Sequence, residues 1–141
     1  MQGESYAGDL TVRESWEMLA RDPNSVLVDV RSQAEWSFVG VPDLSSLGKK
    51  VALVSWQTFP GMKSNPDFGA QLSAAGVSPD KTVLFLCRSG ARSKSAAIAM
   101  TSAGYARCHN VAGGFEGPHD SQRHRGAVDG WKAAGLPWVQ E

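Results

Sequence analysis

The sequence has few cysteines and no long hydrophobic run, and its first residues lack the pattern expected of a signal peptide. Two cysteines among 141 residues are too few for a disulfide-stabilised scaffold, so we expect both thiols to be reduced. No apolar run approaches the ~20 residues that span a bilayer. Residues 1–9 are polar and lack the basic and apolar regions of a leader. These absences predict a soluble, cytoplasmic protein that begins with a polar tail at 1–9.

Net charge is also missing. Fourteen Lys and Arg residues balance fourteen Asp and Glu residues, so the chain has no overall field that would attract nucleic acid or an anionic membrane. We therefore expect neither kind of partner. With 42% hydrophobic residues and no repeat or linker, the chain is predicted to form one domain over 1–141. The sequence does not indicate an oligomeric state.

Short buried strands alternate with amphipathic helices along the chain. The predicted strands are 25–30, 51–56, 82–86 and 107–111. The predicted helices are 12–22, 33–39, 66–75, 93–103 and 127–134. This alternation predicts an α/β fold with a central, mainly parallel sheet of about five strands and helices on both faces.

Capping patterns predict where the first two helices begin. Thr11 with Glu14 and Ser32 with Glu35 have the spacing of a capping box. Gly40 is predicted to end the second of these helices.

Helix ends are also predicted further along the chain. In the third helix, Asn65 and Pro66 are predicted as N-cap and N1, with Phe68, Leu72 and Ala75 facing inward. Gly76 fits the C′ position of that helix. Residues 57–64, which include Phe59 and Met62, are predicted to be a loop, either packed down or forming a rim over a site.

The strand predicted at 82–86 leads directly into Cys87. In open parallel sheets, ligands bind outside the carboxyl ends of the strands, so this thiol is well placed for chemistry. The loop that follows directs backbone N–H groups and a helix N-terminus into one concavity, which favours an anion. Gly90 allows backbone angles that a side chain would resist, and Arg88 and Arg92 add positive charge.

This loop predicts that Cys87 is a thiolate. A free cysteine has a pKa of about 8.5, so ionisation at neutral pH requires about 2.7 kcal/mol of stabilisation. A helix dipole supplies only ~0.3–1 kcal/mol, so the arginines and the backbone amides must provide the rest. Replacing Arg92 should therefore reduce the thiolate fraction. The alternative is that Cys87 is an inert buried thiol.

The remaining cysteine and the histidines do not predict a metal site. Cys108, His109, His119 and His124 match no usual zinc spacing. Cys108 is predicted to be a buried thiol on a strand, with a resolving role toward Cys87 left open. His119, His124 and Arg125 are predicted to lie in a solvated loop.

These residues together resemble a known family. The segment Cys87, Arg88, Ser89, Gly90, Ala91, Arg92, Ser93 is similar to the active-site loop of rhodanese-family sulfurtransferases. The likeness extends to Asp29, Arg31 and Glu35 after the first buried strand, and to the segments 110–115 and 130–137. It covers about 11–139. One departure is Gly40–Leu44, where many relatives have His, Ile, Pro, Gly, Ala.

The resemblance implies a single rhodanese-like domain with a catalytic Cys87. The implied substrate- and anion-binding loop consists of Arg88, Ser89, Gly90, Ala91 and Arg92, and the implied supporting residues are Asp29, Arg31 and Ser93. Cys87 would take a sulfane sulfur from thiosulfate or another persulfide donor. It would pass the sulfur to a thiol, to cyanide or to a protein acceptor. No cofactor and no metal are implied.

Two other functions remain open. A Cys-based phosphatase also holds an anion between a cysteine and an arginine, but only four residues separate Cys87 from Arg92, which makes a small cradle for a phosphoryl group. A non-catalytic rhodanese-like module that binds a partner is the second alternative. Asp29 and Arg31 either brace the loop or contact substrate. We favour bracing for Asp29, because a carboxylate beside the sulfur would oppose its ionisation.

Overall fold

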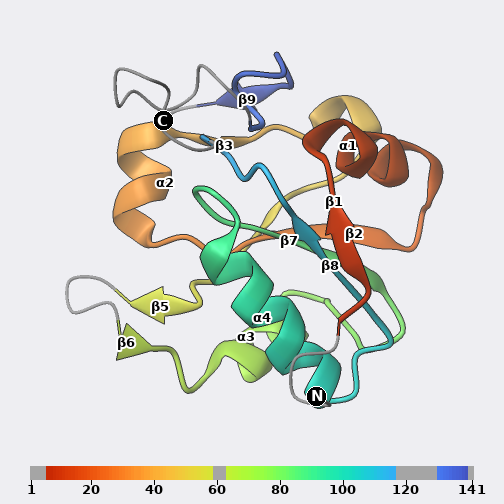
Figure 1. Cartoon of the computed structure of the whole chain (residues 1–141), viewed down its shortest axis with the longest axis vertical. Helices are drawn as coiled ribbons and strands as arrows, with labels where there is room; N and C mark the ends of the chain where they lie inside the picture. Colours follow the sequence, from red (N-terminus) through yellow and green to blue (C-terminus); the bar gives the residue numbers. More distant parts are fainter. Residues whose placement is uncertain (1–5, 59–62, 117–129, 140–141) are drawn as a thin grey trace.

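A five-stranded parallel sheet forms the centre of the computed structural model, which describes residues 6–58, 63–116 and 130–139 (Figure 1). The strand order is β1-β8-β7-β2-β4, and every pair in this sheet is parallel. Its strands are β1 (Gly8–Leu10), β2 (Ser25–Asp29), β4 (Ala52–Leu53), β7 (Thr82–Leu86) and β8 (Arg107–Val111). The predicted α/β fold with about five central strands is confirmed.

In the described residues, four α-helices and several shorter elements complete the fold. The helices are α1 (Val12–Arg21), α2 (Gln33–Val39), α3 (Phe68–Ala74) and α4 (Ala91–Ser102), with a 3₁₀ turn, η2, at Ser45–Leu47. Two small antiparallel pairs lie outside the main sheet: β3 (Val41–Pro42) with β9 (Trp138–Val139), and β5 (Gln57–Thr58) with β6 (Lys63–Ser64).

Both predicted capping boxes are confirmed. The Thr11 side chain accepts the N–H of Glu14, and the Glu14 side chain accepts the N–H of Thr11. Ser32 and Glu35 repeat this arrangement at the start of α2, which ends at Gly40 as expected. Two orphan amides are satisfied at each helix start, so the local sequence determines where α1 and α2 begin.

The sheet separates two hydrophobic clusters. Side chains alternate along β7, so Val83, Phe85 and Cys87 face one cluster while Leu84 and Leu86 face the other. Helices α3 and α4 cover the Cys87 face. Helix α1, η2 and the segment near Trp131 cover the opposite face. The thiol therefore lies on the α4 side of the sheet.

Two predictions at the sheet edges were wrong. Residues 8–9, predicted as part of a polar tail, belong to β1, which pairs in register with β8 from His109 to Val111. At the other edge, the strand predicted at 51–56 is only the two-residue β4, and its Leu53 is 43% exposed. Both are short edge strands, and burial on one side alone leaves a weak apolar signal in the sequence.

The predictions for the third and fourth helices also need correction. Helix α3 begins after Asp67, because Asn65 Oδ1 accepts the N–H of Asp67 in a turn, and Ala75 is exposed. Helix α4 begins at Ala91, two residues before the predicted start, because Gly90 with its positive φ serves as N-cap.

The final segment also differs from its prediction. Residues 130–135 form turns where a helix at 127–134 was predicted, and 127–129 lie outside the described residues. The described ends of the predicted loop at 57–64 pair as β5 and β6, while Phe59 and Met62 lie outside the description. Within the described residues, no helix is long and apolar enough to cross a membrane.

Candidate active site

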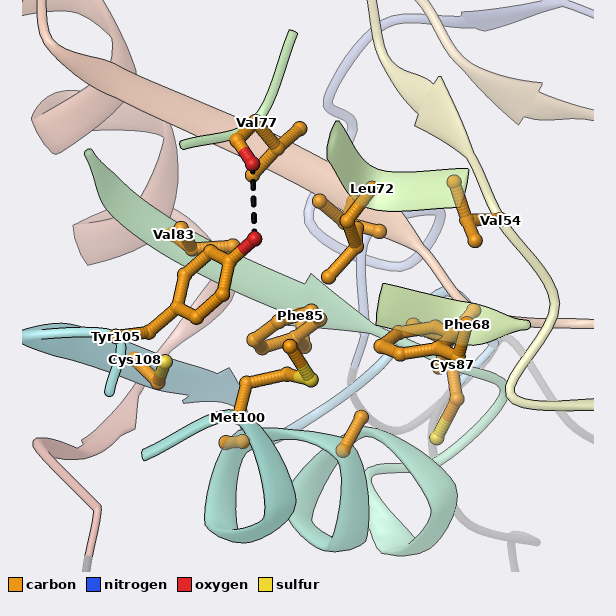
Figure 2. Close-up of a cluster of buried hydrophobic side chains, with 14 residues drawn as sticks. Val54, Phe68, Leu72, Val77, Val83, Phe85, Cys87, Met100, Tyr105 and Cys108 are labelled. Atoms are coloured by element: carbon orange, nitrogen blue, oxygen red, sulfur yellow. Dashed lines mark hydrogen bonds between the residues drawn. The ribbon is translucent and has the colours of Figure 1, made fainter. Parts of the chain in front are cut away.

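Cys87 lies immediately after β7, in the turn that leads to α4 (Figure 2). Its carbonyl accepts the N–H of Phe115 at 2.8 Å, and the carbonyl of Arg88 accepts the N–H of Glu116 at 3.0 Å. These bonds attach the turn to the segment that follows β8. The predicted position at the carboxyl end of a central strand is therefore the observed one.

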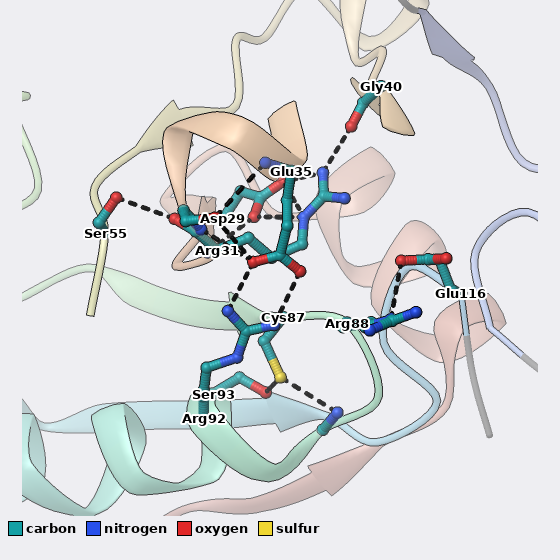
Figure 3. A network of polar contacts seen from close by, with 12 residues as sticks. Asp29, Arg31, Glu35, Gly40, Ser55, Cys87, Arg88, Arg92, Ser93 and Glu116 are labelled. Atoms are coloured by element: carbon teal, nitrogen blue, oxygen red, sulfur yellow. Dashed lines mark hydrogen bonds and ion pairs between the residues drawn. The ribbon is translucent and has the colours of Figure 1, made fainter. Parts of the chain in front are cut away.

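The Cys87 sulfur is enclosed but faces polar groups. The residue is 1% exposed. Sγ accepts the backbone N–H of Gly90 at 3.1 Å, and the Ser93 hydroxyl oxygen lies 3.2 Å from it (Figure 3). We expected several amides around the sulfur. Among the described residues, one amide and one hydroxyl are within hydrogen-bonding distance of it.

Two glycines allow the turn to pack closely. Gly90 has a φ of +110°, and Gly114 has a φ of +70°. A Cβ on Gly114 would lie 2.5 Å from the carbonyl oxygen of Arg88. The segment after β8 therefore approaches the Cys87 turn backbone to backbone, which only glycine permits at this position.

Arg92 does not project freely toward the sulfur. Its two terminal nitrogens donate to the two Glu35 carboxylate oxygens at 2.7 and 2.9 Å. Burial raises the pKa of Glu35, but hydrogen bonds from Arg92 and Ser32 outweigh that effect and lower it to about 2. The same pairing raises the pKa of Arg92, and the nearby Cys87 adds to that rise. Arg92 thus fastens α4 to α2.

Asp29 and Arg31 form a second, fully buried ion pair. The Arg31 Nη2 lies 2.7 Å from Asp29 Oδ2 and also donates to the carbonyl of Gly40 at 2.6 Å. The guanidinium carbon lies 4.3 Å from the centre of the Phe115 ring. Arg31 therefore connects the end of β2, the end of α2 and the segment after β8. We call Asp29, Arg31, Glu35 and Arg92 the charged brace.

Arg88 turns away from the sulfur, toward solvent. Its Nε lies 3.2 Å from Glu116 Oε2, and its side chain is 46% exposed. Ser89 and Ala91 are also exposed. The sequence predicts two free arginines beside Cys87, whereas in the structure each one is paired with a carboxylate. Neighbouring positions in sequence do not reveal such partners, because Glu35 and Glu116 come from other elements.

A chain of neutral polar groups leads away from the sulfur on its other side. Ser93 Oγ lies 2.6 Å from Asn110 Oδ1, and Asn110 Nδ2 donates to Asp9 Oδ1 at 3.0 Å. Ser93 and Asn110 are buried. We call Cys87, Ser93 and Asn110 the neutral chain. Ser93 was predicted as a supporting residue of the site, whereas Asn110 and Asp9 were not. Strand β8 reads Arg-Cys-His-Asn-Val, so the available signal for Asn110 was its position two residues after Cys108, on the same face of the strand.

Cys108 is far from Cys87. It pairs in register with Val83, which lies four residues before Cys87 on the neighbouring strand. At about 3.3 Å per residue, this places the two residues ~13 Å apart along the strands. Figure 2 shows them at opposite ends of the buried cluster. A disulfide needs Cα atoms within about 7 Å, so this fold does not allow Cys108 to resolve Cys87.

A hollow in the described part of the chain has no residue of the Cys87 turn in its lining. It has a volume of about 770 Å³ and lies between α2, β4 and α3, with Trp36, Ser55 and Gln71 among its lining residues. The described residues contain no group of three or more His, Cys, Asp or Glu side chains arranged for a metal. His119, His124 and Arg125 lie outside the description.

Comparison with known proteins identifies the family. The family model described as STR4 middle domain matches residues 7–141. The crystal structure of Rv0390 from M. tuberculosis is 51% identical, covers 97% of this chain and 100% of its own, and has a TM-score of 0.87.

Two more distant proteins agree with that result. Rhodanese-like domain-containing protein 4 of Arabidopsis thaliana is 26% identical over 92% of this chain, which spans 25% of that protein. The polysulfide-sulfur transferase homodimer of Wolinella succinogenes shares the fold at 22% identity, with 99% of this chain and 82% of that chain covered and a TM-score of 0.69. The chain therefore belongs to the STR4 middle domain family, with the rhodanese-like fold.

Proposed function

We propose that this protein is a sulfurtransferase that carries a sulfane sulfur on Cys87. The observation that carries the proposal is the position of the sulfur. Cys87 Sγ accepts a backbone N–H at 3.1 Å in the turn between the central strand β7 and the 12-residue helix α4. The first turn of such a helix presents amides without partners inside the helix. The Gly90 amide and the positive end of the helix favour negative charge on the sulfur beside them.

The proposed reaction has two half-reactions. The Cys87 thiolate attacks the outer sulfur of thiosulfate or of another persulfide donor. A new S–S bond forms, and the old one breaks with its electron pair leaving on sulfite or on the donor thiolate. Cyanide or a thiol acceptor then attacks the outer sulfur of the Cys87 persulfide, and the S–S bond breaks with its electron pair leaving on the Cys87 sulfur. Covalent catalysis of this kind needs no metal or organic cofactor.

The glycines and the charged brace support this chemistry by holding the turn. Gly114 allows the close backbone approach behind Arg88, and Arg92 fastens α4 to Glu35. A preorganised turn lowers the cost of stabilising charge at the sulfur. The polysulfide-sulfur transferase that shares this fold is in line with the proposal.

A non-catalytic binding module is the second candidate. The observation in its favour is that Cys87 is 1% exposed and both nearby arginines are paired with carboxylates. Fold membership does not decide between the two functions, because rhodanese-like folds host more than one.

Sulfur loading separates the two candidates. The protein is incubated with thiosulfate or inorganic polysulfide, desalted, and analysed by intact mass spectrometry. We expect one added sulfur atom in the native chain and in Cys108→Ala, and none in Cys87→Ser. If the native chain gains no sulfur from either donor, sulfur transfer from thiosulfate and polysulfide is excluded. That result would favour the binding module. Phosphate release from an aryl phosphate would instead indicate a phosphatase.

A further inference from the structure

The Ser93 hydroxyl lies between two groups that both can accept its hydrogen. Its oxygen is 3.2 Å from Cys87 Sγ and 2.6 Å from Asn110 Oδ1. A hydroxyl has a single hydrogen to donate, together with lone pairs that can accept. The direction of this short chain therefore depends on which way Asn110 presents its amide.

Asp9 determines the direction of the Asn110 amide. Asn110 Nδ2 lies 3.0 Å from Asp9 Oδ1, and the Tyr6 hydroxyl donates to the same oxygen at 2.8 Å. The bonds from Tyr6 and Asn110 lower the pKa of Asp9. The carboxylate is therefore ionised at neutral pH and can only accept hydrogen bonds. Asn110 must turn its NH₂ group toward Asp9 and its carbonyl oxygen toward Ser93.

This orientation assigns the hydrogens along the chain. The Asn110 carbonyl oxygen cannot donate, so the Ser93 hydroxyl donates to it across the shorter of its two contacts. The Ser93 oxygen then faces the sulfur with a lone pair. A thiol S–H donates into that lone pair, whereas a thiolate would place two lone-pair-bearing atoms against each other at 3.2 Å. The Gly90 N–H can donate to either form of the sulfur.

We infer that Asp9 and Asn110 are positioning residues that keep the Ser93 hydrogen away from the sulfur and thereby hold sulfur-free Cys87 as a thiol. The inference rests on the proposed function only in taking Cys87 as the nucleophile. It replaces the expectation that the turn keeps a resting thiolate. The neutral chain thus favours the protonated form of Cys87. Asp9, which orients the Asn110 amide, lies on the edge strand β1.

The charged groups around the neutral chain come from four elements of the fold. Arg92 on α4, Glu35 on α2 and Asp29 at the end of β2 lie on the sulfur side, and Arg92 interacts with Cys87 electrostatically. Lys94, also on α4, interacts with Asp9 on β1. The variants proposed below leave all of these except Asp9 in place, so their effect reports on the neutral chain.

Alkylation of Cys87 tests the inference directly. The rate of iodoacetamide modification is measured across pH, with peptide mass spectrometry separating Cys87 from Cys108. Asn110→Leu removes the carbonyl oxygen that competes with the sulfur for the Ser93 hydrogen. We therefore expect a reaction about fivefold faster at pH 7, which is the factor that one net hydrogen bond to the thiolate contributes. The midpoint of the rate profile should also move to lower pH. Adding Ser93→Ala to this variant should abolish the gain.

The double variant separates the inference from simple loosening of the core. If Asn110→Leu only opened the site, the double variant would stay fast and the midpoint would not move, which overturns the inference. An unchanged or slower rate in Asn110→Leu would overturn it as well.

Asp9 offers a second test at an exposed position. Asp9→Ala frees the Asn110 amide to turn and should accelerate alkylation, whereas Asp9→Asn keeps an acceptor oxygen and should stay within about twofold of the native rate. Equal rates in the three proteins would contradict the inference. The readout does not involve sulfur transfer. If the variants change the alkylation rate as expected but the native chain fails to load sulfur, only the proposed function is contradicted.

Discussion

The two sides of Cys87 differ in the kind of polar group they offer. On one side, the charged brace consists of two ion pairs that connect β2, α2 and α4. On the other side, the neutral chain reaches from the sulfur through Ser93 and Asn110 to β1. The charged side chains near the thiol are paired with one another, so they mainly hold the secondary-structure elements together. Among the described residues, the groups within hydrogen-bonding distance of the sulfur are neutral.

This difference changes how the site has to be interpreted. A sequence with two arginines near a cysteine suggests that their charges ionise the thiol. In the structure, Arg92 is held by Glu35 and Arg88 by Glu116. The direction of hydrogen bonds becomes as important as the number of charges, because one hydroxyl hydrogen decides whether Ser93 favours the thiol or the thiolate.

The largest expected effect is the loss of the buried pair in the charged brace. Arg31→Leu leaves the Asp29 carboxylate buried at 0% exposure without its partner. Removing one member of a buried pair costs about 3–5 kcal/mol, so the free energy of unfolding measured in urea should fall by that amount. Arg21→Leu, at an exposed position, is the control and should change stability by less than about 0.5 kcal/mol. Similar losses in both variants would show that Arg31 is not a brace.

Gly114 tests whether the turn between the two networks depends on close backbone approach. Gly114→Ala adds strain at positive φ and places a Cβ 2.5 Å from the Arg88 carbonyl oxygen. We expect a loss of about 2–4 kcal/mol in unfolding free energy, together with slower sulfur loading. Gly48 has a similar φ of +68° with no atom within 4 Å, so Gly48→Ala isolates the strain at about 1–2 kcal/mol. Equal losses at both glycines would contradict the close approach.

The pair between Glu35 and Arg92 should appear in the acid stability of the protein. The pKa of Glu35 falls from its usual 4.5 to about 2. Its contribution to stability is therefore fully present above pH 4.5 and is lost as the pH falls toward 2. Glu35→Gln should lower the unfolding free energy by about 1–3 kcal/mol at pH 7, and this difference from the native chain should shrink between pH 4.5 and 2. A difference that stays constant over this range would contradict the paired carboxylate.

Arg88 provides the smallest expected effect. Its side chain is 46% exposed and pairs with Glu116 at the surface, and such pairs contribute about 0–1 kcal/mol. Arg88→Ala should therefore barely change the unfolding midpoint in urea. A loss above about 2 kcal/mol would show that Arg88 belongs to the brace, and the comparison between the two sides would need revision.

Local patterns in the sequence predicted much of the fold. The capping residues at Thr11 and Ser32 and the apolar strands at 25–30 and 82–86 identified their elements, because each signal lies within a few residues. Strand β1 was missed and strand β4 was predicted to be too long, because short edge strands carry little apolar pattern. Helix α4 began earlier than predicted because a glycine, Gly90, serves as its N-cap.

The candidate site was predicted only in part, for a related reason. Cys87 and its turn are contiguous in the sequence, so their position at the end of β7 could be inferred. The partners that define the site are distant in the chain: Glu35 for Arg92, and Asn110 and Asp9 for Ser93. Hydrogen bonds between such residues depend on how the elements pack, and a single sequence carries no direct record of that packing.

The most direct test of the account is a single discharge of loaded protein. The native chain is loaded with sulfur from thiosulfate and then separated from small molecules. It is mixed with cyanide, and the thiocyanate formed and the intact mass of the protein are measured together. We predict one thiocyanate for each sulfur lost from Cys87, with recovery of the original mass and no signal from Cys87→Ser. Thiocyanate from Cys87→Ser at the native level, or a loaded sulfur that cyanide does not remove, would contradict Cys87 as the sulfur carrier.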